Sequence, residues 1–412
     1  MNQEMIEKYV RLIVCSGINI QKDQTLVISA PIECASFTRQ IAQVAYERGA
    51  KDVVVDWADE LFTKTRYLYA PEAAFGEFPE WKKQFYMHYA LNGAAFLTID
   101  AHNPELMKDV NPATIGKETT ARARALKEFA QRKMMGLNAW CVAAYPSKAW
   151  AKKVYPGVSG EEAVEALWRA IIKVSRIGEN DPILSWEKHK EELRTKTDFL
   201  NVSDFKYLHY KNELGTDLRM ELPENHIWIA GATRTPEGVE FSANIPTEEI
   251  FSLPVRTGVN GTVVSSKPLS YNGSIINKLS LTLKDGRIID YQAEEGYEIL
   301  KGIIETDEGS HYLGEVALVP YSSPISLLNT HFYNTLFDEN ASCHLAIGAA
   351  YPCIKNVKSE EDLVKYEINQ SLKHVDFMIG TQDLEIVGTT KDGREVPVFV
   401  QGNFTDCGCA QA

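Results

Sequence analysis

His374 and Asp376 are spaced so that both side chains could bind one metal ion. They lie two apart in the run HVDFMIG, which has the length and apolar character of a buried strand. Side chains two apart on a strand point to the same face. An imidazole and a carboxylate buried together are either polar groups satisfied within a core or two ligands of a metal. The pair alone leaves both interpretations open.

Further carboxylates lie in two motifs upstream of this pair. In NIPTEE, Glu248 and Glu249 are neighbours, and at most one of them can face a shared site because adjacent side chains on extended chain point oppositely. In GEVALVP, Glu315 precedes an apolar strand, where an ionised carboxylate is costly unless it is paired or bound to a metal. The alternatives are an exposed pair of glutamates and an ordinary ion-pair partner.

The segment FDENASCHLAIGAAYP carries a second histidine and a tyrosine. Asp338, Glu339 and Asn340 precede an alanine-rich run that we expect to be helical, with His344 inside it. Tyr351 follows His344 by seven residues, so two helical turns would bring both side chains to nearly the same face. Without a metal, Asp338 or Asn340 would serve as a helix N-cap and Tyr351 as a boundary aromatic residue.

Together these side chains form one set of carboxylates and imidazoles. Such ligands suit Zn²⁺, Co²⁺, Mn²⁺ or Mg²⁺, and the carboxylates outnumber those of a single structural zinc site. We therefore expect two divalent ions that share bridging carboxylates, with Asp376 short enough to reach between them while His374 holds one. Two such ions would lower the pKa of a water between them toward about 7, and the hydroxide could attack a peptide carbonyl.

These four motifs, in this order and at these spacings, resemble those of the thermophilic aminopeptidase family, metallopeptidases that include aminopeptidases T, S and II. The resemblance extends over essentially the whole chain. It implies a metal-dependent aminopeptidase with two divalent ions per chain. It also implies a homodimer in which a non-catalytic α/β domain helps to enclose the active site. The implied metal ligands are Glu249, Glu315, His344, His374 and Asp376, with Glu339 as an additional ligand.

Two kinds of residue would act on the substrate in such a site. Tyr351 would reach the reacting centre and donate a hydrogen bond to the tetrahedral oxyanion. A carboxylate that metal does not fully engage, Glu315 or Glu339, would carry a proton to the leaving amine. One metal could hold the free α-amino group of the substrate, which would explain the removal of N-terminal residues.

The first half of the chain has the pattern of an α/β domain with a mainly parallel sheet. Apolar runs that alternate with amphipathic segments predict parallel strands covered by helices on both faces. Neither a dinucleotide-binding nor a P-loop glycine motif follows any of these runs in the sequence. We assign residues 1–199 to this domain, with roles in substrate enclosure and oligomerisation. The predicted strands are 25–30, 52–57, 94–100 and 139–146, and the predicted helices are 35–50, 120–133, 160–175 and 184–196.

The second half, residues 200–412, reads as a β-rich dimetal catalytic domain. Short alternating runs are separated by turn signals, among them Lys-Asp-Gly at 284–286 and 391–393, where hairpin turns with positive φ belong. We expect mostly antiparallel strands, a few helices, and a curved sheet or an incomplete barrel. The fold class is therefore α/β followed by α+β.

Length, charge and cysteine content restrict the classes of molecule that this chain could bind. A chain of 412 residues is long enough for two domains, and its net charge of −13 argues against nucleic acid and anionic membranes. Peptides are the expected substrates. The first residues show neither a signal peptide nor a membrane span, so we expect a cytoplasmic protein. Seven scattered cysteines fit reduced thiols, and the pair Cys407 and Cys409 lacks a second pair at zinc-site spacing.

Two other classes of protein remain open at this point. A dimetal hydrolase could act on other amide or ester bonds, although phosphoesters are disfavoured because no Arg or Lys cluster accompanies the four motifs in the sequence. The chain could also be a binding protein whose function lies in the α/β half. Chelator-sensitive release of leucine from leucyl-p-nitroanilide would distinguish a peptidase from both.

Overall fold

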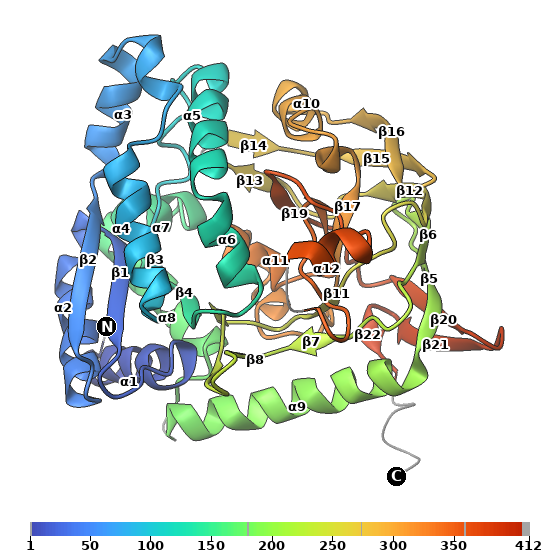
Figure 1. Cartoon of the computed structure of the whole chain (residues 1–412), viewed down its shortest axis with the longest axis horizontal. Coiled ribbons are helices and arrows are strands. Elements are labelled where there is room, and N and C mark those ends of the chain that lie inside the picture. The colour runs from blue at the N-terminus through green and yellow to red at the C-terminus, as the bar shows by residue number, and fades with distance from the viewer. Residues whose placement is uncertain (1, 179–180, 273, 358–359, 406–412) are drawn as a thin grey trace. The chain divides into compact units, whose positions relative to one another are not determined.

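A computed structural model describes residues 2–178, 181–272, 274–357 and 360–405 of the chain, and Figure 1 labels its elements. Cys407 and Cys409 lie outside these residues. Among the helices of the described ranges, none has the length and apolar character needed to cross a membrane.

The chain forms two compact units that are interleaved in sequence. Each unit takes its residues from three separate segments. The first unit comprises Met1–Lys190, Gly231–Thr247 and Asn272–Ser274, and the second comprises Glu191–Ala230, Glu248–Tyr271 and Ile275–Ala412.

The first unit is built on a parallel sheet, as the alternation of strands and helices predicts. Its strands lie in the order β10-β4-β3-β1-β2, and each neighbouring pair is parallel. Strand β10 comes from the later segment of this unit and pairs with β4 at the edge. The bounds are β1 Thr25–Pro31, β2 Asp52–Ala58, β3 Ala95–Asp100, β4 Trp140–Ala144 and β10 Asn244–Ile245, beside a small ribbon of β8 Thr233–Arg234 and β9 Glu240–Phe241.

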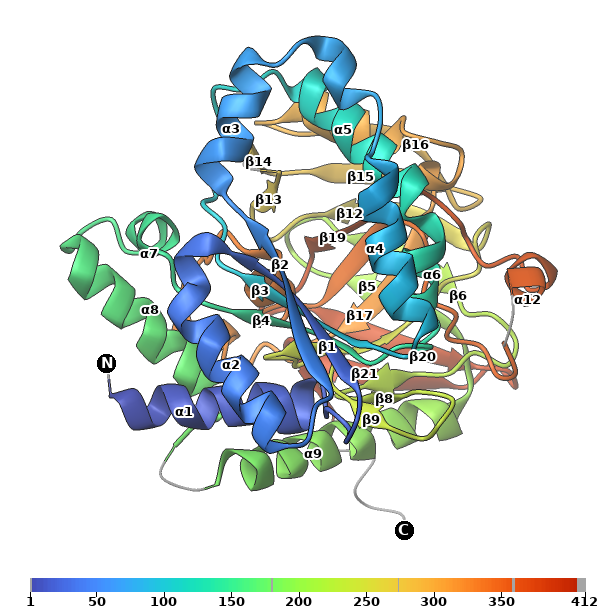
Figure 2. The same ribbon diagram turned by 60° about the vertical axis from the view of Figure 1, so that its left-hand side comes forward.

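Helices cover both faces of this sheet, as Figures 1 and 2 show. On one face, residues of α4 and α6 pack against Val27 and Phe96. On the other, Tyr9 and Phe37 stack with ring centroids 5.9 Å apart, and Trp168 packs edge-on against both. The helices are α1 Gln3–Leu12, α2 Ala35–Glu47, α3 Glu60–Tyr69, α4 Glu80–Leu91, α5 Pro112–Ala125, α6 Lys127–Met134, α7 Lys148–Val154, α8 Gly160–Val174 and α9 Pro182–Ser203.

Two helical differences from the sequence prediction have local causes. The helix predicted over 120–133 is divided into α5 and α6 because Leu126 leaves helical geometry, with φ −100° and ψ 14°. Helix α3 was not predicted from the sequence. None of its residues is buried, so its apolar side chains do not recur with the period of a helix that faces a core.

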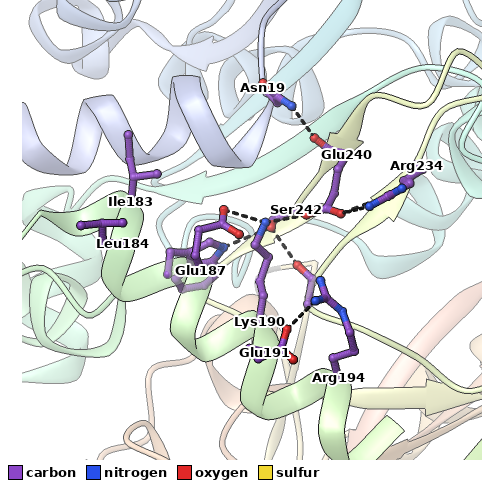
Figure 3. Close-up of polar contacts among 12 residues, drawn as sticks. Asn19, Ile183, Leu184, Glu187, Lys190, Glu191, Arg194, Arg234, Glu240 and Ser242 are labelled. Carbon is purple, nitrogen blue, oxygen red and sulfur yellow. Dashed lines mark hydrogen bonds and ion pairs between the residues drawn. The ribbon is translucent and has the colours of Figure 1, made fainter. Parts of the chain in front are cut away.

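The first half of α9 is fixed to the first unit by ion pairs. Lys190 is 6% exposed, and its Nζ lies 2.8 Å from Glu187 Oε1 and 2.7 Å from Glu240 Oε1. Arg234 lies 2.9 Å from the second oxygen of Glu240, and Figure 3 shows these contacts. Because Lys190 and Arg234 neutralise the same carboxylate, the ribbon of β8 and β9 is held to the start of α9.

The second unit consists mainly of antiparallel strands in two sheets. One sheet has the order β16-β15-β12-β6-β5-β20-β21-β22 and the other β19-β18-β17-β11-β7. The larger sheet contains β5 Phe205–Lys211, β6 Asp217–Glu221, β12 Val259–Val264, β15 Ser280–Lys284, β16 Arg287–Gln292, β20 Glu385–Thr390, β21 Glu395–Val400 and β22 Asn403–Phe404. The smaller contains β7 Ile229–Ala230, β11 Ile250–Ser252, β17 Leu313–Leu318, β18 His344–Gly348 and β19 His374–Met378. The remaining elements are β13 Leu269–Tyr271, β14 Ser274–Ile276, α10 Tyr297–Ile304, α11 Thr335–Glu339 and α12 Glu360–Lys365.

One hydrophobic core joins the two sheets of the second unit. Leu208 and Leu218 of the larger sheet share it with Val316, Leu345 and Phe377 of the smaller. We predicted one curved sheet or incomplete barrel, whereas the strands form two sheets packed across this core. The predicted hairpin at 284–286 is present, with positive φ at its aspartate and its glycine, 49° and 77°.

Asp100 and His102 form an ion pair at the end of β3, with 2.5 Å between Oδ1 and Nδ1. Asp100 raises the pKa of His102 to about 9, against the opposing effect of burial. Because that pKa is higher in the folded chain, the pair's contribution to stability is complete below about pH 6.5 and is lost as pH rises through about 9. NMR titration should place the His102 midpoint near pH 9, and Asp100→Asn should return it toward about 6.5. A wild-type midpoint near 6.5 would contradict this prediction.

Candidate metal centre

The predicted ligands, with the exception of Glu339, gather at one face of the smaller sheet of the second unit. Its strands alternate between two faces, and the core takes Ile250, Val316, Leu345 and Phe377. The residues between them therefore project from the opposite face. On that face Glu315 pairs with Ala346, which pairs with Asp376, while Gly348 pairs with His374. The alternation predicted for HVDFMIG is confirmed, since His374 and Asp376 lie on one strand, β19, two residues apart.

Four distances join the ligand atoms into two groups. His344 Nε2 lies 3.1 Å from Glu249 Oε2 and 3.5 Å from Glu315 Oε1. His374 Nε2 lies 3.6 Å from Glu315 Oε2 and 3.5 Å from Asp376 Oδ1. Within each group the ligand atoms are all within 4.8 Å of one another. One group is Glu249, Glu315 and His344, and the other is Glu315, His374 and Asp376.

Both imidazoles are oriented by backbone carbonyls. His344 Nδ1 lies 3.0 Å from the carbonyl oxygens of Glu339 and Ser342, and His374 Nδ1 lies 2.7 Å from that of Ala349. A hydrogen bond from Nδ1–H leaves the lone pair of Nε2 directed at the carboxylates, as in histidines that bind metals. His344 Nε2 and Asp376 Oδ1 are buried and have no hydrogen-bond partner in the described part of the chain. Each of the two ligand groups therefore contains one buried acceptor without a partner, which fits a cation bound in each group.

The pKa values of the side chains in and beside the two groups also favour bound cations. Burial and the neighbouring carboxylates raise the pKa of Glu315 above its ordinary value and that of Glu339 well above it. Burial alone would lower the pKa of His344, but Glu249 and Glu315 raise it well above the usual range. Several carboxylates buried together are costly unless positive charge compensates them. Divalent ions supply that charge, so the donor set suits them.

Glu339 and Asn340 lie beside the two groups. Glu339, at the end of α11, is outside both groups, although its carboxylate interacts electrostatically with Glu249, Glu315 and Asp376. Asn340 is fully buried, and its Oδ1 accepts a hydrogen bond of 2.7 Å from the backbone N–H of Glu248. Sequence reasoning treats Asn340 only as a possible N-cap. Its hydrogen bond to Glu248 could not be predicted from the sequence, because the two residues are 92 positions apart.

The prediction of a helix from His344 to Tyr351 is wrong. His344–Gly348 forms strand β18, which pairs with β17 on one side and β19 on the other, and Tyr351 lies beyond its end. The turn after β18 still brings Tyr351 to the site, with its ring centroid 5.3 Å from that of His374 and the rings at 86°. Burial raises the pKa of Tyr351 well above its ordinary value, so the phenol keeps its proton at neutral pH.

Known proteins are similar to this chain in both sequence and fold. A family model described as thermophilic metalloprotease (M29) matches residues 2–404. Aminopeptidase 2 of Geobacillus stearothermophilus is 47% identical over 405 residues, which cover 98% of each chain. Aminopeptidase AmpS of Bacillus subtilis strain 168 is 47% identical over 404 residues, covering 97% of this chain and 98% of the relative.

A solved structure leads to the same conclusion. Wild-type AmpT from Thermus thermophilus matches the fold with a TM-score of 0.90 at 35% identity, covering 98% of this chain and 99% of that one. The resemblance carried by the four sequence motifs is thereby confirmed. The chain belongs to the thermophilic metalloprotease (M29) family of metal-dependent peptidases.

Proposed function

We propose that this chain is a metallo-aminopeptidase that removes N-terminal residues from peptides with the aid of two divalent ions. One observation carries the proposal: Glu315 Oε1 lies 3.5 Å from His344 Nε2, while Glu315 Oε2 lies 3.6 Å from His374 Nε2. A carboxylate whose two oxygens face different imidazoles suits a site in which one carboxylate is a ligand of two metals. Relatives named as aminopeptidases support the peptide substrate.

The two groups of ligands would each hold one ion. In this assignment Glu315 would be a ligand of both ions, a role that the sequence alone suggested for Asp376. Oxygen and imidazole ligands accept Zn²⁺, Co²⁺, Mn²⁺ or Mg²⁺, and Glu339, whose carboxylate interacts electrostatically with both groups, would be the additional ligand. Divalent ions bound here would lower the pKa of water and polarise a substrate carbonyl.

The remaining chemistry falls to two side chains. The Tyr351 hydroxyl, kept protonated by burial, donates a hydrogen bond to the oxyanion that forms at the carbonyl. A carboxylate must also deliver a proton to the leaving amine. Both oxygens of Glu315 face histidines, whereas Glu339 lies outside the two groups. We therefore propose that Glu339 delivers the proton to the leaving amine, with Glu315 as the alternative.

We further propose that the second unit, to which most of residues 200–412 belong, is the catalytic domain and that residues 1–199 contribute substrate enclosure and oligomerisation. All the proposed ligands follow residue 240. Helix α3 exposes a row of apolar side chains, Leu61, Phe62 and Tyr69, at 67%, 70% and 82%, and such a surface suits contact between two copies. The proposed assembly is a homodimer, and the proposed location is the cytoplasm. A net charge of −13 fits peptides better than nucleic acid.

Release of p-nitroaniline from leucyl-p-nitroanilide tests the proposed function. Purified protein with added Zn²⁺, Co²⁺, Mn²⁺ or Mg²⁺ should hydrolyse it, a chelator should stop the reaction, and returning the metal should restore it. An amino-terminally blocked substrate should remain intact, because hydrolysis depends on the free amine. Cleavage of esters or blocked amides at similar rates would instead favour a hydrolase of other bonds, an alternative that family membership does not favour.

A further inference from the structure

An apolar strip adjoins the metal ligands on the same face of the smaller sheet. Glu249 immediately precedes β11, and Phe251 is the second residue of that strand, so the two side chains, two apart on extended chain, point to the same side of the sheet. Between them Ile250 points the other way and is buried in the core. Phe251 therefore shares a face with the proposed ligands.

The register of the strands places this strip beside His344. Ile229 pairs with Phe251, Phe251 pairs with Ala317, and Ala317 pairs with His344. Neighbouring strands are separated by about 4.8 Å, so Phe251 lies about 10 Å from His344. The side chain between them, that of Ala317, is a single methyl group.

Tyr351 completes the strip. Its ring lies 5.6 Å from that of Phe251 and 5.3 Å from that of His374, in edge-on geometry with both. Phe251, Ile229 and Tyr351 are only partly buried, and they pack on an apolar cluster whose other members include Leu253 and Ile354. Partly buried aromatic and aliphatic groups next to a reacting centre provide a surface for an apolar part of a substrate.

We infer that the strip of Ile229, Phe251 and Tyr351 receives the side chain of the residue to be removed, and that it selects large apolar N-terminal residues. This inference rests on the proposed aminopeptidase function. A leucine or phenylalanine side chain gains contact with Phe251, whereas alanine is too short to reach it. Aspartate or glutamate is disfavoured, because the strip offers no cation and the site already contains the carboxylates of Glu249 and Glu315.

The test compares kcat/KM for leucyl- and alanyl-p-nitroanilide in the metal-loaded full chain. The wild type should favour leucine by about tenfold or more, and Phe251→Ala should reduce this ratio toward one while metal content stays unchanged. Phe251→Trp should shift the preference toward alanine by filling the space. Phe404→Ala serves as the matched control, because Phe404 is another partly buried phenylalanine of this unit, packed on the core of the larger sheet.

Because each ratio is measured within one variant, a general loss of stability does not change it. Should Phe251→Ala fail to fold, Ile229→Ala tests the same surface. A leucine-to-alanine ratio unchanged in Phe251→Ala and Ile229→Ala, with activity retained, overturns the inference and leaves the aminopeptidase function standing. A wild type that cleaves neither substrate would contradict the proposed function itself.

Discussion

Replacing His344 with alanine should lower kcat/KM for leucyl-p-nitroanilide by at least about 10³-fold at saturating metal. The loss of a ligand opens one of the two groups, and the several kcal/mol that a bound ion contributes to the transition state are lost. Glu249→Ala should have the same effect, because Glu249 and His344 belong to the same group. Both variants should keep their fold, since the hydrophobic cores consist of other residues. Steady-state kinetics, metal content and circular dichroism together check this prediction.

A histidine of similar burial supplies the control for this experiment. His226 is 5% exposed, lies in the second unit, and bonds through Nδ1 to the carbonyl of Pro223. His226→Ala should keep its metal content and should retain kcat/KM within about threefold, less than 1 kcal/mol. Near wild-type turnover of His344→Ala at limiting metal would remove His344 from the site. Global unfolding of His344→Ala but not of His226→Ala would make the metal structural.

Removal of one oxygen atom, in Tyr351→Phe, should lower kcat by about 10² to 10³. The ring of Tyr351 lies beside that of His374, and burial keeps its hydroxyl protonated, so the hydroxyl can donate a hydrogen bond to a developing oxyanion without being a metal ligand. An interaction made only in the transition state affects kcat and kcat/KM alike, so KM should change little. Metal content should equal that of the wild type.

Tyr210→Phe is the matched control for that variant. Tyr210 is fully buried in the core of the same unit, and its hydroxyl has no hydrogen-bond partner within the residues that the structure describes. Its loss should leave kcat unchanged. If kcat of Tyr351→Phe also stays within about threefold of the wild type, the hydroxyl of Tyr351 has only a packing role.

The sequence predicts the elements whose pattern is local. The parallel strands of the first unit are short apolar runs between amphipathic segments, and β1 to β4 agree with their predicted positions to within two residues. The i+2 spacing of His374 and Asp376 likewise identifies a shared face, because that geometry is set within one strand. Where one segment determines the structure, reading that segment is sufficient.

The misassigned parts depend on partners far away in the chain. The run HLAIG is buried at all five positions, and after His344 it contains only apolar residues and a glycine, so it fits a buried strand or a helix equally well. Only its pairing with β17 and β19 makes it a strand. The position of Glu315 between two histidines depends on the same register. Residues 231–247 join the first unit through the pairing of β10 with β4 and the ion pair of Glu240 with Lys190, contacts between distant segments that carry no signal in the sequence.

The central claim is that Glu315 joins two metal ions. Anomalous X-ray scattering from crystals grown with Co²⁺ tests it most directly, because each ion gives a separate peak. We expect two peaks per chain, one contacting Glu249 and His344, the other contacting His374 and Asp376, with one Glu315 oxygen facing each. A single peak, or two peaks of which only one contacts Glu315, would contradict the account.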